Sequence, residues 1–146
     1  MLLNIVYNEY SADEKKDIVK LLLANKLPVA DIEHSSIQFI VARLEGELVG
    51  CIGLEHYGKH VLLRSFAVRK EYQGQAVGQN LLNEFICKCA NLDVKTIHLL
   101  TTTAQGFFGN RKFVVTDRKD APGVIQRTTE FSHLCPSSSI YMTYSI

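Results

Sequence analysis

The order of apolar and polar positions along the chain predicts an alternation of strands and helices. Short apolar runs bounded by turn residues predict strands at 2–7, 38–44, 48–54, 61–68, 96–102, 113–115 and 140–144. Apolar positions at helical spacing predict a helix from Ser11 to Asn25, a longer one from Val77 to Cys89, and short ones at 29–32, 104–110 and 122–131. The pattern therefore indicates an α/β (α+β) chain.

The connections between these elements predict how the strands pair. Turn sequences at 45–47 and 57–59 make the strands at 38–44, 48–54 and 61–68 an antiparallel set. The helix from Val77 then carries the chain across to the strand at 96–102, which therefore runs parallel to the strand at 61–68. We expect one mixed, mostly antiparallel sheet of about six or seven strands flanked by helices, in a single domain over 1–146.

The stretch that leads into the long helix is rich in small residues. Gln73-Gly74-Gln75-Ala76-Val77-Gly78 contains two glycines and one alanine, so several backbone N–H groups can converge where the helix begins. A helix N-terminus also favours an anion. The composition predicts either a phosphate cradle or a plain tight turn between strand and helix. The chain has no Gly-Lys-Ser/Thr here and no GxGxxG spacing, which argues against a nucleotide P-loop and a dinucleotide-binding fold.

The flanks of this loop carry a family resemblance. Phe66-Ala67-Val68, four residues, and then Tyr72-Gln73-Gly74-Gln75-Ala76-Val77-Gly78 resemble the acetyl-coenzyme A signature of the GNAT superfamily of N-acetyltransferases, with Gln73, Ala76 and Gly78 at its three fixed positions. The resemblance implies that the loop amides hold the coenzyme A (CoA) pyrophosphate and that the strand end at 66–68 pairs with pantetheine. It also implies a V-shaped splay between the fourth and fifth strands, which leaves N–H groups near Ala67 and Val68 available to polarise the acetyl oxygen.

A second motif extends the resemblance beyond the loop. Thr101, Ala104 and Phe108, followed by Lys112-Phe113, are similar to the family's Asn-x-x-Ala-x-x-x-Tyr and Gly-Phe, with departures at Thr101, Phe108 and Lys112. The resemblance places Thr101 and Phe108 beside acetyl-CoA. Phe108 stands where a tyrosine commonly serves as general acid, and a phenylalanine has no proton to donate.

The resemblance is closest to the acetyltransferases associated with arsenic-resistance genes. It rests on Leu27-Pro28-Val29-Ala30-Asp31, on Leu62 to Val68, and on the tail. The tail residues are Ala121-Pro122, Ile125, Thr129-Glu130-Phe131, Leu134-Cys135-Pro136 and Met142. This subgroup implies an amino-acid-like arsenical as one candidate acceptor.

Acetyl transfer to an amine requires a neutral amine, a polarised carbonyl and a leaving thiolate. Glu55 is the first candidate for the general base, with His56, Glu33 and His34 as others, and a base can act through one water. The candidates for the general acid are Tyr72, Ser65 and Cys135, although the thiolate can also leave unassisted. Each of these side chains also has an ordinary structural interpretation at a strand or helix end.

Arg64 is the candidate for recognising the acceptor. It lies in the middle of an apolar strand, on the same face as Leu62 and Phe66 if the alternation is regular. A buried arginine needs a charge partner, and Glu47, Glu55 and Asp31 are the candidates for an internal ion pair. The alternative is that Arg64 binds a carboxylate or another oxyanion of an anionic amine. Glu33 is the second candidate substrate-binding residue.

Composition narrows the classes of function. A net charge of +1 on 146 residues argues against a general nucleic-acid binder. The chain shows no signal peptide and no apolar run as long as a membrane span. The four cysteines at 51, 87, 89 and 135 contain no Cys-x-x-Cys pair, so we expect reduced thiols in the cytoplasm and no metal site. The expected partners are acetyl-CoA and a small amine, and a homodimer is compatible with the sequence. The competing function is a GNAT-fold module that binds acyl-CoA without turnover.

Overall fold

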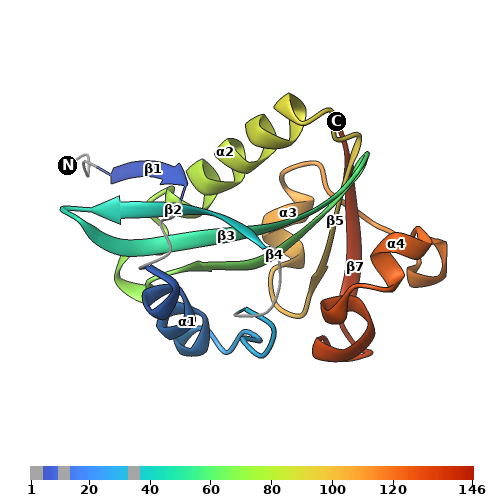
Figure 1. Cartoon of the computed structure of the whole chain (residues 1–146), viewed down its shortest axis with the longest axis horizontal. Helices are drawn as coiled ribbons and strands as arrows, with labels where there is room; N and C mark the ends of the chain where they lie inside the picture. Colours follow the sequence, from blue (N-terminus) through green and yellow to red (C-terminus); the bar gives the residue numbers. More distant parts are fainter. Residues whose placement is uncertain (1–4, 10–13, 33–36) are drawn as a thin grey trace. The chain divides into compact units, whose positions relative to one another are not determined.

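The computed structural model describes residues 5–9, 14–32 and 37–146, which are drawn in colour in Figure 1. The chain divides into two compact units. The first unit holds the described parts of Met1–Glu55 together with Ser65–Lys88, and the second holds His56–Arg64 together with Cys89–Ile146. The expectation of a single domain over 1–146 stays a prediction.

The described residues form seven strands of one mixed sheet, in the order β1-β2-β3-β4-β5-β7-β6. The strands are β1 (Ile5–Glu9), β2 (Gln38–Leu44), β3 (Glu47–Tyr57), β4 (His60–Val68), β5 (Thr96–Thr101), β6 (Val114–Val115) and β7 (Ile140–Ser145). The β4–β5 pair is parallel, whereas β1–β2, β2–β3, β5–β7 and β6–β7 are antiparallel. This confirms the predicted mixed, mostly antiparallel sheet flanked by helices.

The parallel pair is short. Its register joins 60–62 of β4 to 96–98 of β5, whereas β4 continues to Val68 and β5 to Thr101. A pairing that covers only the first third of β4 is consistent with the V-shaped splay between the fourth and fifth strands that the resemblance implies.

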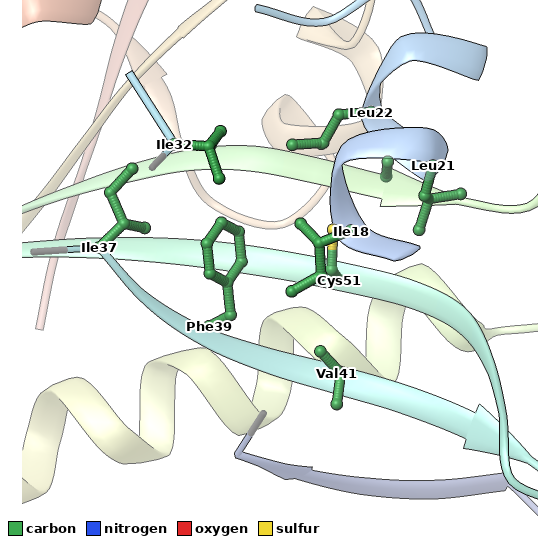
Figure 2. Close-up of a cluster of buried hydrophobic side chains, with 9 residues drawn as sticks. Ile18, Leu21, Leu22, Ile32, Ile37, Phe39, Val41 and Cys51 are labelled. Atoms are coloured by element: carbon green, nitrogen blue, oxygen red, sulfur yellow. The ribbon is translucent and has the colours of Figure 1, made fainter. Parts of the chain in front are cut away.

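Two helices cover opposite faces of the sheet in the first unit. Helix α1 (Lys15–Ala24) packs Ile18, Leu21 and Leu22 onto one face, where Figure 2 shows them above Phe39 and Val41 of β2 and Cys51 of β3. Helix α2 (Val77–Asn91) covers the other face. A Cβ built on Gly50 would lie 2.9 Å from Leu81 Cδ1, so the small residue lets β3 pass close under α2.

The second unit has its own apolar cluster. Leu62 of β4, Leu100 of β5 and Tyr141 of β7 pack against residues of the tail, namely Ala121, Ile125 and Phe131. Two short helices belong to this unit, α3 (Gln105–Gly109) and α4 (Gly123–Gln126), and a π-helical turn spans Glu130–Leu134. The tail therefore folds onto the sheet next to the first half of β4.

Two helix predictions are wrong. The predicted helix at 122–131 is broken into α4 and the π-helical turn, because the Thr128 hydroxyl donates to the Ile125 carbonyl (2.7 Å) and accepts the Phe131 N–H (3.3 Å). The short helix predicted at 29–32 does not form: these residues end in a turn, in which the Ile32 N–H donates to the Val29 carbonyl over 3.2 Å. Ser11, where the sequence predicts that the first helix begins, lies outside the described residues, and Glu14 accepts a hydrogen bond from Nε of Arg43 over 2.7 Å.

The described helices are short. The longest is α2 with 15 residues, and none of the described helices has both the length and the apolar character needed to cross a bilayer.

Candidate functional site

The loop between β4 and α2 has the shape that an anion-binding loop needs. A 3-10 turn over Lys70–Tyr72 leads into exposed residues at 73–76, and α2 begins at Val77. Gly74 has φ of 80° and Ala76 has φ of 67°, so both adopt the left-handed backbone that the tight turn requires. Nothing lies within 4 Å of a Cβ placed on Gly74, so the space over this residue is open to a ligand.

Two glutamine side chains hold this loop in place. Gln73 donates from Nε2 to the carbonyl of Val68 over 3.0 Å, and Gln75 donates to the carbonyl of Glu71 over 3.1 Å. Gln73 therefore ties the loop to the end of β4. The Asn80 N–H donates to the Ala76 carbonyl over 3.0 Å, and the N–H groups before it at the start of α2, including that of Gly78, come too early in the helix to have an intrahelical acceptor.

Alternation along β4 identifies which amide faces away from β3. The N–H of Arg69 donates to the carbonyl of Val49 over 2.8 Å, so odd-numbered amides at this end of β4 point toward β3. The amide of Ala67 is engaged there with the thiol of Cys51. The N–H of Val68 points to the opposite edge of the strand, which makes Val68, and not Ala67, the candidate donor to an acetyl oxygen.

The expected alternation does not continue through the middle of β4. Ser65 has φ of 53°, a left-handed conformation that is rare for a residue other than glycine and is typical of a β-bulge. Consequently Leu62 and Phe66 do not flank Arg64 on one face in the regular way that the sequence predicts. Ser65 is 8% exposed, so its side chain, a candidate general acid, is buried in this structure.

Arg64 makes an internal ion pair with a residue that the sequence did not nominate. Its Nε lies 3.1 Å from Oε2 of Glu130, with side-chain exposures of 0% and 7%. Glu47, Glu55 and Asp31 were the expected partners, and Glu47 instead lies 3.5 Å from Arg69. A partner in the tail had no local signal, because nothing in the spacing of Glu130 relates it to β4.

Cys135 joins the same cluster. Burial, together with the charge and hydrogen bond of the Glu130 carboxylate, raises the pKa of the Cys135 thiol to about 12. The thiol is therefore neutral at physiological pH and acts as a hydrogen-bond donor to Glu130. A thiol with a raised pKa gives up its proton less readily than an ordinary thiol, and the catalytic role of Cys135 stays a prediction.

The two residues of the second motif have structural contacts. The hydroxyl of Thr101 accepts the N–H of Ala104 over 2.9 Å and so fixes the turn from β5 into α3. Phe108 is 4% exposed, and its ring packs edge-on against Phe107 and Phe113 with centroid distances of 5.2 Å each. Position 108 thus belongs to an aromatic cluster of the second unit.

The candidate bases are only partly described. Glu55 lies within β3, which runs three residues further than expected, and its side chain is half-buried. His56 is exposed and contacts the carbonyl of Gly58 through Nε2 at 2.8 Å. Glu33 and His34 lie outside the described residues. Glu55 therefore remains the predicted base.

A groove of about 820 Å³ lies beside the loop in the first unit. It is lined by α1, by the β2–β3 turn and by Arg69, Lys70 and Gln73. Arg69 is bound to Glu71 at 2.9 Å and to Glu47 at 3.5 Å, and acidic residues line the groove as well. This balance of charge does not suit a pyrophosphate, which the amides of 74–78 can hold instead.

Sequence reasoning missed a second buried polar chain in the second unit. His60 Nδ1 lies 2.9 Å from His98 Nε2, and His98 Nδ1 lies 2.6 Å from the hydroxyl of Tyr141. Burial, and then the charge of His60, lowers the pKa of His98 to about 4. Among the described residues, no three His, Cys, Asp or Glu side chains are grouped so as to hold a metal ion.

Comparisons with known proteins agree on one fold. A family model described as an acetyltransferase (GNAT) domain matches residues 35–115, more than half of the chain. No curated protein matches the chain in sequence. A GNAT-family acetyltransferase from Staphylococcus aureus has a similar structure, with a TM-score of 0.78 and 23% identity over 97% of this chain and 98% of that one.

Two further solved structures carry a ligand. An acetyltransferase of the same family from Elizabethkingia anophelis, with acetyl-CoA bound, matches with a TM-score of 0.71 and 20% identity over 98% of this chain and 99% of that one. N-acetylglutamate synthase from Neisseria gonorrhoeae, complexed with coenzyme A and L-arginine, matches with a TM-score of 0.81 and 16% identity. That match covers 99% of this chain but 34% of the synthase chain, so this chain spans about a third of the synthase.

Proposed function

Because the chain belongs to the GNAT acetyltransferase family, we propose that it transfers an acetyl group from acetyl-CoA to the primary amine of a small, amino-acid-like acceptor. The observation that carries this proposal is the loop at 73–78, whose left-handed Gly74 and Ala76 leave open space over the start of α2. CoA or acetyl-CoA bound to structures of the same fold supports the choice of cosubstrate.

The proposed residues supply binding and electrostatic stabilisation. The amides of Gly74 to Gly78 hold the pyrophosphate, with Gln73 fixing the loop and Phe66 to Val68 pairing with pantetheine. When the nitrogen lone pair of the acceptor attacks the acetyl carbon, the carbonyl electrons move to oxygen, where the N–H of Val68 stabilises them. Collapse reforms the carbonyl, breaks the carbon–sulfur bond and leaves the electron pair on the CoA sulfur.

Two proton transfers complete the reaction. The amine nitrogen loses one proton to Glu55, directly or through one water. The CoA thiolate leaves without an acid and takes its proton from solvent, since a thiol with a pKa near 8.5 is a good leaving group. This route accounts for a phenylalanine at 108 and requires no acid role of Cys135, Ser65 or Tyr72.

The acceptor that we propose is anionic, with Arg64 as the residue that recognises its acidic group. Arg64 is balanced by Glu130 and its side chain is buried, so an acidic acceptor would compete with Glu130 for the guanidinium. Glu33 stays a predicted second contact. The resemblance to arsenic-associated acetyltransferases supports an amino-acid-like arsenical as one member of this substrate class.

The alternative function is a module that binds acyl-CoA without turnover. The observation that favours it is the aromatic cluster around Phe108, which offers no phenol at the position of the family's general acid. Release of CoA thiol from acetyl-CoA with a panel of amines distinguishes the two functions. The panel contains glutamate-like amino acids, their phosphinic and arsenical analogues, and the corresponding amides. Turnover of any of the acidic amines supports the enzyme, whereas tight acetyl-CoA binding with no turnover across the panel supports the module.

A further inference from the structure

The middle of β4 adopts a backbone conformation that its own residues do not favour. Ser65 is not a glycine, yet its φ is 53°, a conformation that is unfavourable for a residue with a side chain unless the surroundings enforce it. The bulge at Ser65 comes directly before Phe66 to Val68, so it sets the direction in which the backbone of these residues points.

One side chain of the neighbouring strand spans this bulge. The thiol of Cys51 in β3 donates to the carbonyl of Ser65 over 3.3 Å, and the N–H of Ala67 donates to the same sulfur. Cys51 is 0% exposed and lies in the apolar cluster beneath α1, where Figure 2 shows it close to Ile18. Burial raises the pKa of this thiol to about 12, so the S–H that donates to Ser65 is present at physiological pH.

The two hydrogen bonds hold Ser65, the residue at the bulge, and Ala67, two positions further along β4. Between them lies Phe66, and directly after them lies Val68, whose N–H points to the edge away from β3. A sulfur that holds Ser65 and Ala67 therefore fixes the aim of the Val68 amide. A few tenths of an ångström matter here, because an oxyanion donor must sit about 2.7–3.1 Å from the developing negative charge.

We propose that Cys51 is a positioning residue that clamps the bulge at Ser65 and thereby aims the N–H of Val68 at the acetyl oxygen. This inference rests on the proposed function, because it assigns Cys51 a part in the same acetyl transfer. Cys51 touches neither cosubstrate nor acceptor and acts through the backbone of β4.

The test compares three variants by steady-state kinetics with an acceptor found in the amine panel. Cys51→Ala removes both hydrogen bonds, whereas Cys51→Ser retains a donor and an acceptor at the same position. Cys89→Ala is the matched control, because Cys89 is also 0% exposed but lies in α2. We expect kcat of Cys51→Ala to fall about 10-fold or more with less than a 2-fold change in KM for the acceptor, since one misplaced oxyanion donor affects the transition state alone.

The conservative variant and the control then separate positioning from packing. Cys51→Ser should retain kcat within about 3-fold, and Cys89→Ala should keep wild-type kcat even if it unfolds at a lower denaturant concentration. Equal losses of kcat in Cys51→Ala and Cys89→Ala, or wild-type kcat in Cys51→Ala, would overturn the inference.

A second measurement requires no turnover and separates failure of this inference from failure of the proposed function. Amide hydrogen exchange at Ala67 should be faster in Cys51→Ala than in the wild type and in Cys89→Ala, because the amide loses its bond to sulfur. Unchanged exchange in a folded Cys51→Ala protein would overturn the clamp by itself. Failure of the wild type to bind acetyl-CoA would instead remove the proposed function.

Discussion

The Nε of Arg64 lies 3.1 Å from Oε2 of Glu130, and both side chains are almost fully buried. The pair joins the first half of β4 to the tail, and the thiol of Cys135 adds a further hydrogen bond to the Glu130 carboxylate. Removal of one partner of a buried pair leaves the other charge uncompensated, which costs more than the pair itself contributes. The tail is therefore coupled to the strand that leads into the proposed acetyl-binding edge.

The first prediction concerns this coupling. Glu130→Gln should lower the free energy of unfolding by about 3–5 kcal/mol, because the buried guanidinium of Arg64 loses the charge of the Glu130 carboxylate. Urea denaturation measures the change. The matched control is Arg69→Ala, which removes an exposed ion pair with Glu71 and should leave the free energy of unfolding almost unchanged. A Glu130→Gln protein as stable as Arg69→Ala would mean that the pair contributes nothing to the fold.

The second prediction concerns the charge of the acceptor. Arg64→Ala should lose roughly 10- to 150-fold in kcat/KM for an acidic amine, since a charge-assisted hydrogen bond contributes about 1.5–3 kcal/mol. On the uncharged amide analogue the loss should be much smaller, and calorimetry should find an almost unchanged affinity for acetyl-CoA. Equal losses on the acid and the amide would show that Arg64 supports the structure with Glu130 and does not recognise the substrate.

The third prediction concerns the loop. Gly74→Val should weaken acetyl-CoA binding, measured by calorimetry, because a branched side chain fills the open space over the loop and disfavours a φ of 80°. Gly46→Val is the control, since Gly46 in the β2–β3 turn has φ of 81° and equally open surroundings. Both variants should lose similar stability, and only Gly74→Val should lose affinity. The same affinity in the two variants would place the pyrophosphate elsewhere.

The fourth prediction concerns stability at acid pH. The pKa of His98 is about 4 in the folded protein, against an ordinary value of 6.5 that applies when it is unfolded, so the unfolded chain binds the extra proton between these values. The folded state should be fully stabilised above pH 6.5 and should lose up to about 3 kcal/mol as the pH falls to 4. His60, Tyr141 and Asp120 are the titratable neighbours that act in this cluster.

Denaturation of His98→Gln at several pH values checks this assignment. The variant cannot take up the proton, so its stability should fall less steeply between pH 6.5 and 4 than that of the wild type. His56→Gln serves as the control, because His56 is exposed in the β3–β4 turn region. An unchanged slope in His98→Gln would show that another group causes the acid sensitivity.

The fifth prediction concerns position 108. Phe108→Tyr places a hydroxyl in a cluster of aromatic rings and should lower stability by about 1–3 kcal/mol if that hydroxyl finds no partner. If the thiolate leaves unassisted, kcat should be equal to or higher than that of the wild type. A large loss of kcat with the fold preserved would show that the ring at 108 packs against a substrate.

Features that depend only on neighbouring residues could be predicted from the amino-acid sequence. The strands at 38–44 and 140–144, the helix from Val77 and the turn at 45–46 follow from local periodicity and turn chemistry, and the structure confirms them. The prediction of an anion-binding loop was equally local, because it rests on the small residues at 74–78 that open a helix, and it stays a prediction. These properties depend on side-chain size and spacing within one turn or one strand.

Ion pairs between distant residues, and the left-handed backbone at Ser65, became visible only in the folded chain. Arg64 and Glu130 are far apart in the chain, and no periodicity relates them, so only the folded tail could reveal the partner. The left-handed conformation of Ser65 could not be predicted from the sequence either. A serine does not favour that conformation, and contacts such as those of Cys51 stabilise it. A local hydrophobic pattern indicates which face of a strand or helix a side chain occupies. The residue that this side chain contacts depends on how the strands and the tail assemble.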